Sequence, residues 1–180
     1  MTTIIVDDGF ELRPVTPASA QTIFKSIIRS GDHLRRWLPF IENTKSVGDT
    51  RRFIKTTIKT PCPKKDMIFE ISVNNVFAGL ISLKEIDNLN AKAEIGYWLD
   101  VNMTGKGIMQ RACKALISYS FDELKLNRVW IKTAVGNKKS AAIPVNLGFY
   151  FEGIERDGEL LNGKFHDLMV YSMLKNEWKQ

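Results

Sequence analysis

Residues 94–110 read EIGYWLDVNMTGKGIMQ, and this stretch indicates how the chain folds. An apolar strand ends near Asp100, a turn carries Gly105-Lys106-Gly107, and a long amphipathic helix follows. A junction of this kind points free backbone N–H groups and the positive end of a helix dipole at one spot. That spot can hold an anion, and a pyrophosphate is an obvious candidate.

Length and composition indicate one soluble globular domain spanning residues 1–180. The apolar fraction of 44% and the charged fraction of 26% are ordinary for such a protein. No apolar run approaches the ~20 residues that cross a bilayer. The start of the chain lacks a basic segment followed by an apolar one, which argues against a secretory signal peptide.

The net charge is +6, and much of the excess lies in adjacent pairs. A solvated surface explains such pairs, and so does attraction to a phosphorylated cofactor or to an RNA-rich target. The sequence holds no nucleic-acid-binding motif. The pairs are Arg35-Arg36, Arg51-Arg52, Lys64-Lys65 and Lys138-Lys139.

The two cysteines give no sign of a disulfide framework or a metal site. Cys62 lies in a Pro-Cys-Pro loop, and Cys113 lies inside the long helix, where it fits a packing role better than a nucleophilic one. Cysteine usage of this kind predicts a cytoplasmic protein.

The first third of the chain is mainly helical in pattern. A short strand at 10–15 precedes a helix from Thr16-Pro17 to about Ile28. Residues 34–38 resemble a second short helix that ends before Pro39. Residues 46–58 form a third helix, and its apolar spacing predicts that Phe53, Ile54 and Ile58 share the buried face.

The remainder alternates between strands and helices. Asn74-Asn75 is a tight turn between two apolar runs, and Gly79 is a candidate bulge position. The expected strands are 67–73, 76–85, 93–100, 129–135, 149–154 and 165–174, and the expected helices are 105–124 and 137–147. This order predicts an α/β (α+β) domain with a mixed, mostly antiparallel sheet and helices on both faces. Strands 93–100 and 129–135 would lie side by side and parallel.

Four stretches in register resemble the GNAT acetyltransferase superfamily, in particular its RimJ/RimL branch of protein N-terminal acetyltransferases and the bacillar type within it. The stretches are Glu94–Leu99 with Gly105–Ile108, Asn127–Val129, Asn137–Ser140 with Leu147–Phe149, and Glu152-Gly153 through Asn162-Gly163 to His166-Asp167. The resemblance covers nearly the whole chain. It implies the GNAT fold, with a splayed parallel strand pair, and acetyl transfer from acetyl-CoA to a primary amine.

The resemblance also implies where acetyl-CoA binds. Main-chain groups of Leu99 and Val101 would pair with the pantetheine arm, and Asn137 would hold it further along. The N–H groups of the glycine turn and the first helical turn would hold the pyrophosphate, and these map to Gly105, Lys106, Gly107, Ile108 and Met109. The two glycines allow a close phosphate approach. No metal is implied.

The chain departs from the wider family at one catalytic position. Many GNAT enzymes carry a tyrosine where this chain has Pro144, and proline cannot donate a proton to a leaving thiolate. In the RimL-like pattern a serine supplies that function, and Ser140 matches it. Ser140 is therefore the candidate general acid or thiol hydrogen-bond donor, although a serine here also suits helix capping.

Two glutamates are candidates for the general base. Glu159 matches the base of RimL-like enzymes, and Glu94 lies on the strand leading into the cofactor site, where a charge needs a partner or a polar cleft. Each has an alternative, Glu159 as a solvated loop residue and Glu94 as a paired structural acid. His33 and His166 are weaker candidates. The ordinary pKa of an α-amine, near ~8, means that such an acceptor needs little help from a base.

The sequence does not identify the amine that accepts the acetyl group. A protein N-terminus, such as that of a ribosomal protein, is the main hypothesis. The alternatives are a small amine such as a polyamine, an aminoglycoside or an amino acid, and a non-catalytic acyl-CoA-binding module. Clustered acids would favour a polycation, and a neutral, wide groove would favour a peptide terminus. An exposed final strand could also pair across subunits in a homodimer or a larger homo-oligomer.

Overall fold

Eight strands form one sheet in the order β1-β2-β3-β4-β5-β6-β8-β7 in the computed structural model, which describes residues 2–59 and 66–179. Every neighbouring pair is antiparallel except β5 and β6. The sheet is thus mixed and mostly antiparallel, as the sequence predicts. Its strands are β1 (Ile4–Asp7), β2 (Phe10–Pro14), β3 (Met67–Val73), β4 (Val76–Asp87), β5 (Lys92–Leu99), β6 (Arg128–Ala134), β7 (Tyr150–Leu161) and β8 (Lys164–Leu174).

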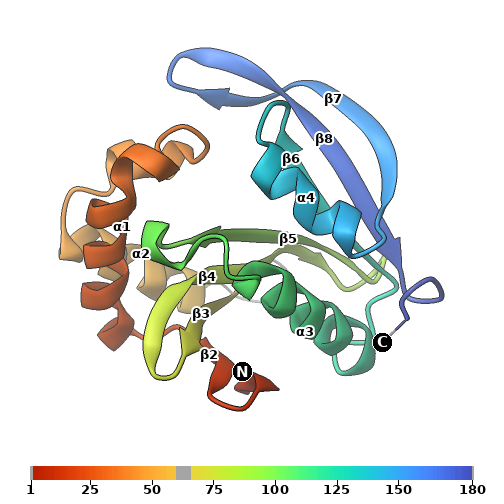
Figure 1. Cartoon of the computed structure of the whole chain (residues 1–180), viewed down its shortest axis with the longest axis horizontal. Helices are drawn as coiled ribbons and strands as arrows, with labels where there is room; N and C mark the ends of the chain where they lie inside the picture. The colour runs from red at the N-terminus through yellow and green to blue at the C-terminus, as the bar shows by residue number, and fades with distance from the viewer. Residues whose placement is uncertain (1, 60–65, 180) are drawn as a thin grey trace.

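Helices cover both faces of the sheet (Figure 1). On one face α1 and α2 pack with Trp98 of β5, and on the other α3 and α4 pack with Ile95 of the same strand. Because side chains alternate along a strand, β5 contributes to both cores. The helices are α1 (Ala20–Leu34), α2 (Val47–Lys59), α3 (Ile108–Asp122) and α4 (Lys138–Asn146), with 3-10 turns η1 (Pro17–Ser19), η2 (Pro39–Asn43) and η3 (Val101–Met103).

The parallel strands β5 and β6 separate soon after they meet. They pair only where Lys92–Glu94 faces Arg128–Trp130. Beyond Glu94, β5 continues to pair with β4, whereas β6 continues to pair with β8. The sheet therefore opens between residues 95–99 and residues 131–134, and in Figure 1 the two strands diverge with α4 beside β6. The splayed pair expected from the sequence is confirmed.

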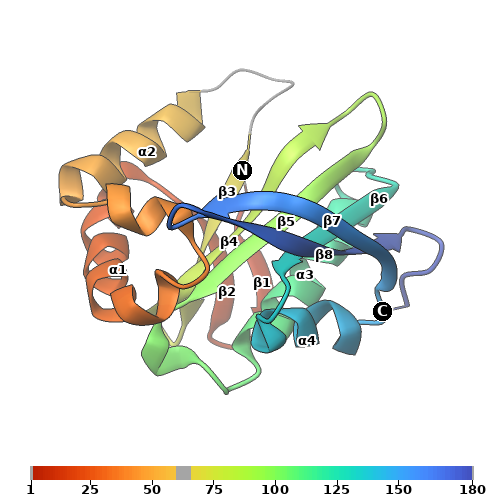
Figure 2. The ribbon, with the colours of Figure 1, turned by 90° about the horizontal axis from the view of Figure 1, so that it is seen from above.

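The β7–β8 hairpin extends from the far edge of the sheet across the face that carries α1 (Figure 2). At its tip the side-chain amide of Asn162 donates a 3.4 Å hydrogen bond to the carbonyl oxygen of Arg35, just after α1. The hairpin is thus held against the end of α1, and both strands are longer than the sequence predicts.

Two expected turn features are confirmed. Asn74 and Asn75 both have positive φ, 49° and 62°, which matches the tight hairpin turn between β3 and β4. Ile71 pairs with Gly79 and the next residue pairs with Phe77, so Ala78 is the extra residue of a bulge beside Gly79.

The N-terminal third requires several corrections. Strand β1, a short edge strand held by β2, is not among the expected elements. The expected second short helix at 34–38, ending before Pro39, is also wrong. Instead α1 runs on to Leu34, and Pro39 opens η2, since the fixed φ of proline suits a first helical position. The expected loop around Cys62 and the pair Lys64-Lys65 lie outside the described residues.

Helix α2 forms where the sequence predicts it, but its buried face is narrower. Ile54 is fully buried, whereas Phe53 is 52% exposed and Ile58 is 39% exposed. Thr50 and Thr57 take the buried positions on either side of Ile54. The prediction that Phe53 and Ile58 share the buried face is wrong, because threonines and not these apolar residues face α1 and the sheet.

None of the helices among the described residues is both long and apolar enough to span a bilayer.

The burial difference on α2 gives a stability test. We expect Ile54→Ala to lower the free energy of unfolding by about 2–4 kcal/mol, because it removes a buried side chain and leaves a cavity. Phe53→Ala, on the neighbouring exposed position, should cost under about 1 kcal/mol. Urea denaturation followed by circular dichroism measures both, and a larger loss for Phe53→Ala would contradict the burial described above.

Candidate active site

The backbone conformation of the turn before α3 requires glycine at two positions. Gly105 and Gly107 have φ of +76° and +68°, in the left-handed region that favours glycine, and nothing lies within 4 Å of a Cβ added at either position. Gly107 is the N-cap of α3, and Arg111 N–H closes the first turn on its carbonyl at 3.2 Å. Side chains larger than hydrogen would strain the turn without clashing with neighbours.

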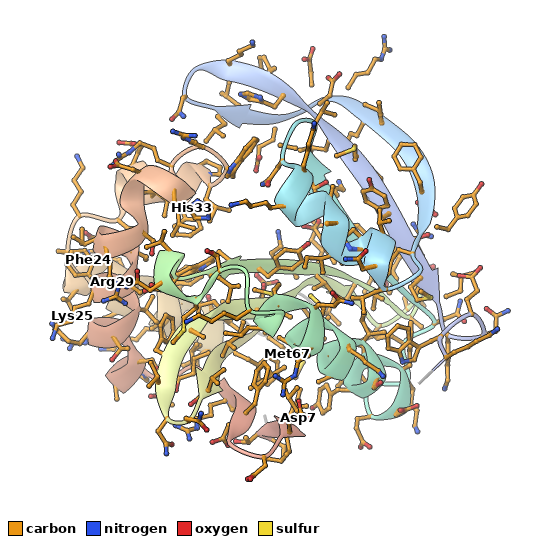
Figure 3. All side chains as sticks on the ribbon, viewed as in Figure 1. Asp7, Phe24, Lys25, Arg29, His33 and Met67 are labelled. Carbon is orange, nitrogen blue, oxygen red and sulfur yellow. The ribbon has the colours of Figure 1, made fainter. Side chains whose placement is uncertain are left out.

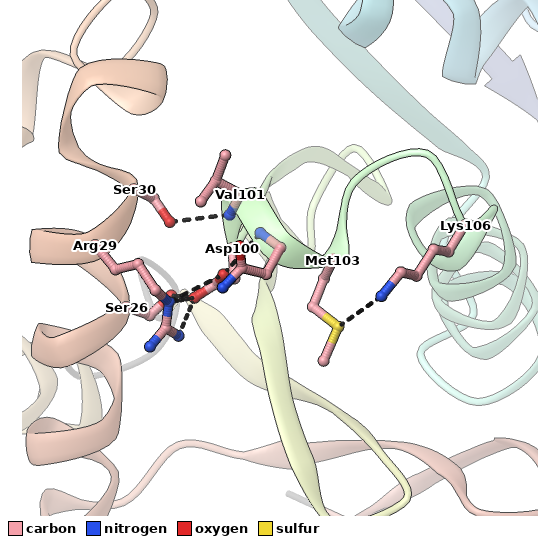
Figure 4. Close-up of polar contacts among 8 residues, drawn as sticks. Ser26, Arg29, Ser30, Asp100, Val101, Met103 and Lys106 are labelled. Carbon is pink, nitrogen blue, oxygen red and sulfur yellow. Dashed lines mark hydrogen bonds and ion pairs between the residues drawn. The ribbon is translucent and has the colours of Figure 1, made fainter.

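Six successive amides at this turn are free to bind a ligand. Among the described residues none accepts a hydrogen bond from the N–H groups of residues 105–110. Ile108 and Met109 anchor the turn, because both residues are about 95% buried. Lys106 is exposed, with its Nζ 3.9 Å from Met103 Sδ (Figure 4). The turn can therefore hold an anion at a helix N-terminus.

A buried carboxylate fixes the start of this turn. Asp100 is 1% exposed and accepts hydrogen bonds from Ser26 Oγ at 2.6 Å, from Asn102 N–H at 3.0 Å and from the Arg29 guanidinium (Figure 4). Burial acts to raise the pKa of Asp100, but the bonds from Arg29 and Ser26 hold it below its usual range. The charged Asp100 thus ties the end of β5 to α1.

The two residues expected to bind pantetheine differ in what their backbones offer. Val101 N–H donates to Ser30 Oγ at 3.0 Å, and the Val101 carbonyl accepts from Thr104 Oγ1 at 2.9 Å. Leu99 lies opposite Gly79 of β4, so its other edge faces the opening between β5 and β6. Both assignments stay predictions, and Leu99 has the freer edge.

The first turn of α4 presents Asn137 and Ser140 at the same opening. Asn137 caps the helix, with its Oδ1 accepting from Ser140 N–H at 3.2 Å. Ser140 Oγ donates to Tyr97 Oη at 3.3 Å, and Tyr97 Oη in turn donates to the Ser140 carbonyl at 3.0 Å. Pro144 is buried one turn later inside α4. Ser140 therefore lies at the opening, and its hydroxyl has a partner from β5.

Tyr97 is a site residue that the sequence did not single out. It shares the α3 side of β5 with Ile95 and Leu99, which the period of two along the strand indicates. Burial is the main cause that raises the pKa of the Tyr97 phenol well above its usual range, so it stays protonated. Only the packing of α4 against β5 reveals its contact with Ser140.

Glu94 lies on the opposite face of β5, within a compact polar cluster. It is 9% exposed, its Oε1 forms a 2.7 Å ion pair with Lys84 Nζ, and its Oε2 accepts from Trp130 Nε1 at 3.3 Å. A Cβ added to Gly96 would come within 2.6 Å of Lys84 Cε, so the glycine leaves room for the lysine to cross β5. Glu94 has the partners of a structural acid, and its role as a base stays a prediction.

Glu159 lies near Glu94, although 65 residues separate them in sequence. It faces His166 across the β7–β8 hairpin, and Lys84, His166 and Glu94 all act on its charge. Burial is the largest influence and raises the pKa of Glu159, Lys84 and His166 oppose that rise, and Glu94 adds to it. Glu159 forms no ion pair with any residue that the structure describes.

The candidate residues thus divide between the two faces of the sheet. The glycine turn before α3 and Ser140 lie on the α3 and α4 side, whereas Glu94, and Glu159 whose charge it influences, lie on the side that carries α1. Cys113 is fully buried, and burial raises the pKa of its thiol, which fits a packing role. His33 lies near the end of α1 (Figure 3), and its role as a weaker candidate base stays a prediction.

Residues 10–150 match the profile of the Acetyltransferase (GNAT) domain family. The chain belongs to this family. It is 41% identical over 180 residues to the "Putative ribosomal N-acetyltransferase YdaF" of Bacillus subtilis (strain 168), covering 99% of this chain and 98% of YdaF. It is 30% identical to the ribosomal-protein-serine acetyltransferase of Escherichia coli (strain K12), covering 96% of each. The chain is therefore an N-acetyltransferase of the GNAT type.

A solved structure of RimL, the ribosomal L7/L12 alpha-N-protein acetyltransferase, in complex with coenzyme A is also similar to this GNAT chain. The TM-score is 0.91 at 28% identity, covering 96% of this chain and 98% of that chain. The GNAT fold predicted from the sequence is thereby confirmed. Among the described residues, no cluster of His, Cys, Asp and Glu could hold a metal ion.

The cluster around Glu159 predicts a pH effect. A base must be ionised, so activity falls as pH drops through its pKa. Lys84→Met removes a cation that lowers the pKa of Glu159 and frees the Glu94 charge that raises it. We expect the acid limb of the pH profile of kcat/KM to move to higher pH.

The control is Lys25→Met, because Lys25 projects from the outer side of α1 (Figure 3). It changes the net charge equally and should leave the acid limb in place. An unmoved limb in Lys84→Met would show that Glu159 is not the group that titrates.

Proposed function

We propose that this chain transfers the acetyl group of acetyl-CoA to the α-amino group of a protein N-terminus, by direct attack in a ternary complex. The observation that carries the proposal is the pairing of charges around Glu159, on the side of the sheet that carries α1. Lys84 pairs with Glu94, Lys132 pairs with Glu155 at 2.8 Å, and Glu159 is left without an ion pair among the described residues. The Glu159 carboxylate is thereby available for the ammonium group of an acceptor.

The donor side supports acetyl-CoA as the co-substrate. The free amides of residues 105–110 suit a pyrophosphate, and the unpaired edge of residues 95–99 suits the amides of a pantetheine arm. Asn137, Leu99 and Val101 keep their expected roles along that arm. The similarity to RimL, whose solved structure holds coenzyme A, adds to this support.

The two candidate residues divide the proton chemistry. The acceptor ammonium first releases one proton to solvent. Glu159 then takes a proton from the neutral amine as its nitrogen forms a bond to the acetyl carbon. Ser140 donates its hydroxyl hydrogen bond to the sulfur as the carbon–sulfur bond breaks and the electron pair moves to sulfur. The proton on Glu159 returns through water to the thiolate, so the products are an amide and a thiol. Glu94 keeps Lys84 beside Glu159 and is the second candidate for the base.

The same charges argue against a polycationic acceptor. A polyamine carries several ammonium groups, and favourable binding needs several uncompensated carboxylates. Of the three glutamates Glu94, Glu155 and Glu159, two are paired with lysines, and Glu159 forms no ion pair with a described residue. An α-amine, with an ordinary pKa near ~8, also loses its proton more easily than a lysine side chain. The names of two relatives point to ribosomal proteins as acceptors, and we extend that to this chain.

Replacing the two candidate catalytic residues tests the chemistry. Ser140→Ala and Glu159→Gln should each lower kcat by about 100-fold or more, since each removes one proton-handling group. The rate of CoA release with a saturating N-terminal peptide measures this. Near wild-type kcat in both variants would contradict the assignments.

Acetyl-CoA affinity separates an enzyme from a binding module. Acetyl-CoA should raise the melting temperature of both variants as much as that of the unaltered chain, because neither residue lies in the phosphate-binding turn. No thermal shift in any of the three proteins at saturating acetyl-CoA would refute the donor site itself.

An acceptor screen tests the substrate class. At equal concentration, peptides with a free N-terminal α-amine should be acetylated at least about tenfold faster than spermidine, an aminoglycoside or free amino acids. Matched peptides with a blocked N-terminus and an internal lysine serve as the control. Turnover of the small amines alone would overturn the protein-acceptor proposal.

A further inference from the structure

Pro144 leaves α4 without the tyrosine that many GNAT enzymes carry, yet a phenol still reaches this helix. Tyr97 comes from β5, 43 residues before Ser140, and contacts the first turn of α4. It makes two contacts with one residue, to the hydroxyl and to the carbonyl oxygen of Ser140. The charge pairs around Glu159 do not involve it.

The geometry assigns each hydrogen of this pair. A phenol has one hydrogen, and at 3.0 Å it goes to the Ser140 carbonyl, which can only accept. At 3.3 Å the Ser140 hydroxyl then donates its hydrogen to the phenolic oxygen. A serine hydroxyl otherwise rotates freely to suit its surroundings. Tyr97 thereby fixes both the backbone of Ser140 and the direction of its hydroxyl.

The contact also bridges the opening in the sheet. After Glu94, the strands β5 and β6 no longer pair, and α4 begins soon after β6 ends. The bonds between Tyr97 and Ser140 therefore rejoin β5 to the β6–α4 segment beyond the point of separation. Because these bonds tie Ser140 to a side chain of β5, they help to set the distance between Ser140 and the free edge of that strand.

We propose that Tyr97 is a positioning residue that holds Ser140 in place for the leaving sulfur. Tyr97 keeps its own proton throughout, and only the Ser140 hydroxyl turns from the phenolic oxygen to the sulfur as the carbon–sulfur bond breaks. The inference rests on the proposed role of Ser140. It adds that the phenol absent from α4 is replaced in part by one that acts through a serine.

The test is a double-mutant cycle between Tyr97→Phe and Ser140→Ala. Tyr97→Phe keeps the ring and removes only the hydroxyl. We expect it to lower kcat about tenfold, the effect of one lost hydrogen bond, with the KM for acetyl-CoA unchanged within about twofold. The double variant should have the same kcat as Ser140→Ala within about twofold, because Tyr97 acts only through Ser140.

Tyr171→Phe is the matched control. Tyr171 is a buried tyrosine of the same core, and its hydroxyl contacts Met169 Sδ at 3.5 Å and not Ser140. It should retain wild-type kcat. Melting temperatures of all four variants show whether any loss of rate follows from loss of folded protein.

Any one of four outcomes would overturn the inference. Wild-type kcat in Tyr97→Phe would remove the role, and a further tenfold loss in the double variant would show that Tyr97 acts independently of Ser140. A rise in the KM for acetyl-CoA with unchanged kcat would place Tyr97 in donor binding. If Ser140→Ala itself keeps full kcat, the proposed role of Ser140 fails together with this inference. A loss in Ser140→Ala without one in Tyr97→Phe refutes Tyr97 alone.

Discussion

The separation of β5 from β6 after Glu94 is the constraint on which the rest of the site depends. Each strand keeps its outer neighbour, β4 or β8, and the twist of the two halves of the sheet carries them apart. Residues 95–99 are left with main-chain groups that no strand satisfies on one edge. Backbone groups in such a place need water or a ligand. The sheet thus leaves main-chain groups available on this edge without dedicating side chains to it.

The opening also explains why the site uses both faces of the sheet. The free amides of residues 105–110 lie at the end of β5 on one side, and Glu159 comes from a hairpin that crosses the other. Asp100 joins the two, because it holds η3 in place and binds Ser26 and Arg29 of α1. A shift of α1 would therefore disturb the turn before α3 as well as the face that α1 covers.

Patterns within short stretches of sequence make much of the fold around the site predictable. Glycines with positive φ mark the turn at 105–107, and the alternation along 93–100 places Glu94 and Ile95 on opposite faces. The order of elements gives the mixed sheet and its parallel pair. The candidate roles of Ser140 and Glu159 came from a family resemblance, because neither residue has a local pattern that distinguishes it from a cap or a loop acid.

What sequence could not give depends on contacts between distant segments. The bonds between Tyr97 and Ser140 require the placement of α4, and the exposure of Phe53 depends on which side of α2 meets α1. Strand β1 has too few residues for a pattern, and it forms because β2 offers an edge. In each case the contact that decides the structure is with a residue too far along the chain for hydrophobic periodicity to show it.

The residues around Glu94 and Glu159 distinguish the roles of these two chemically identical side chains. Glu94 and Glu159 are alike in chemistry and lie close to the same lysine. The Lys84 side chain passes Gly96, which has no side chain in its way, and forms an ion pair with Glu94, and Glu94 also accepts a hydrogen bond from the Trp130 indole. Glu159 receives only the longer-range effect of Lys84, and burial is the largest cause that raises its pKa. The partners of Glu94, and the lack of an ion pair at Glu159 among the described residues, therefore favour Glu159 over Glu94 as the base.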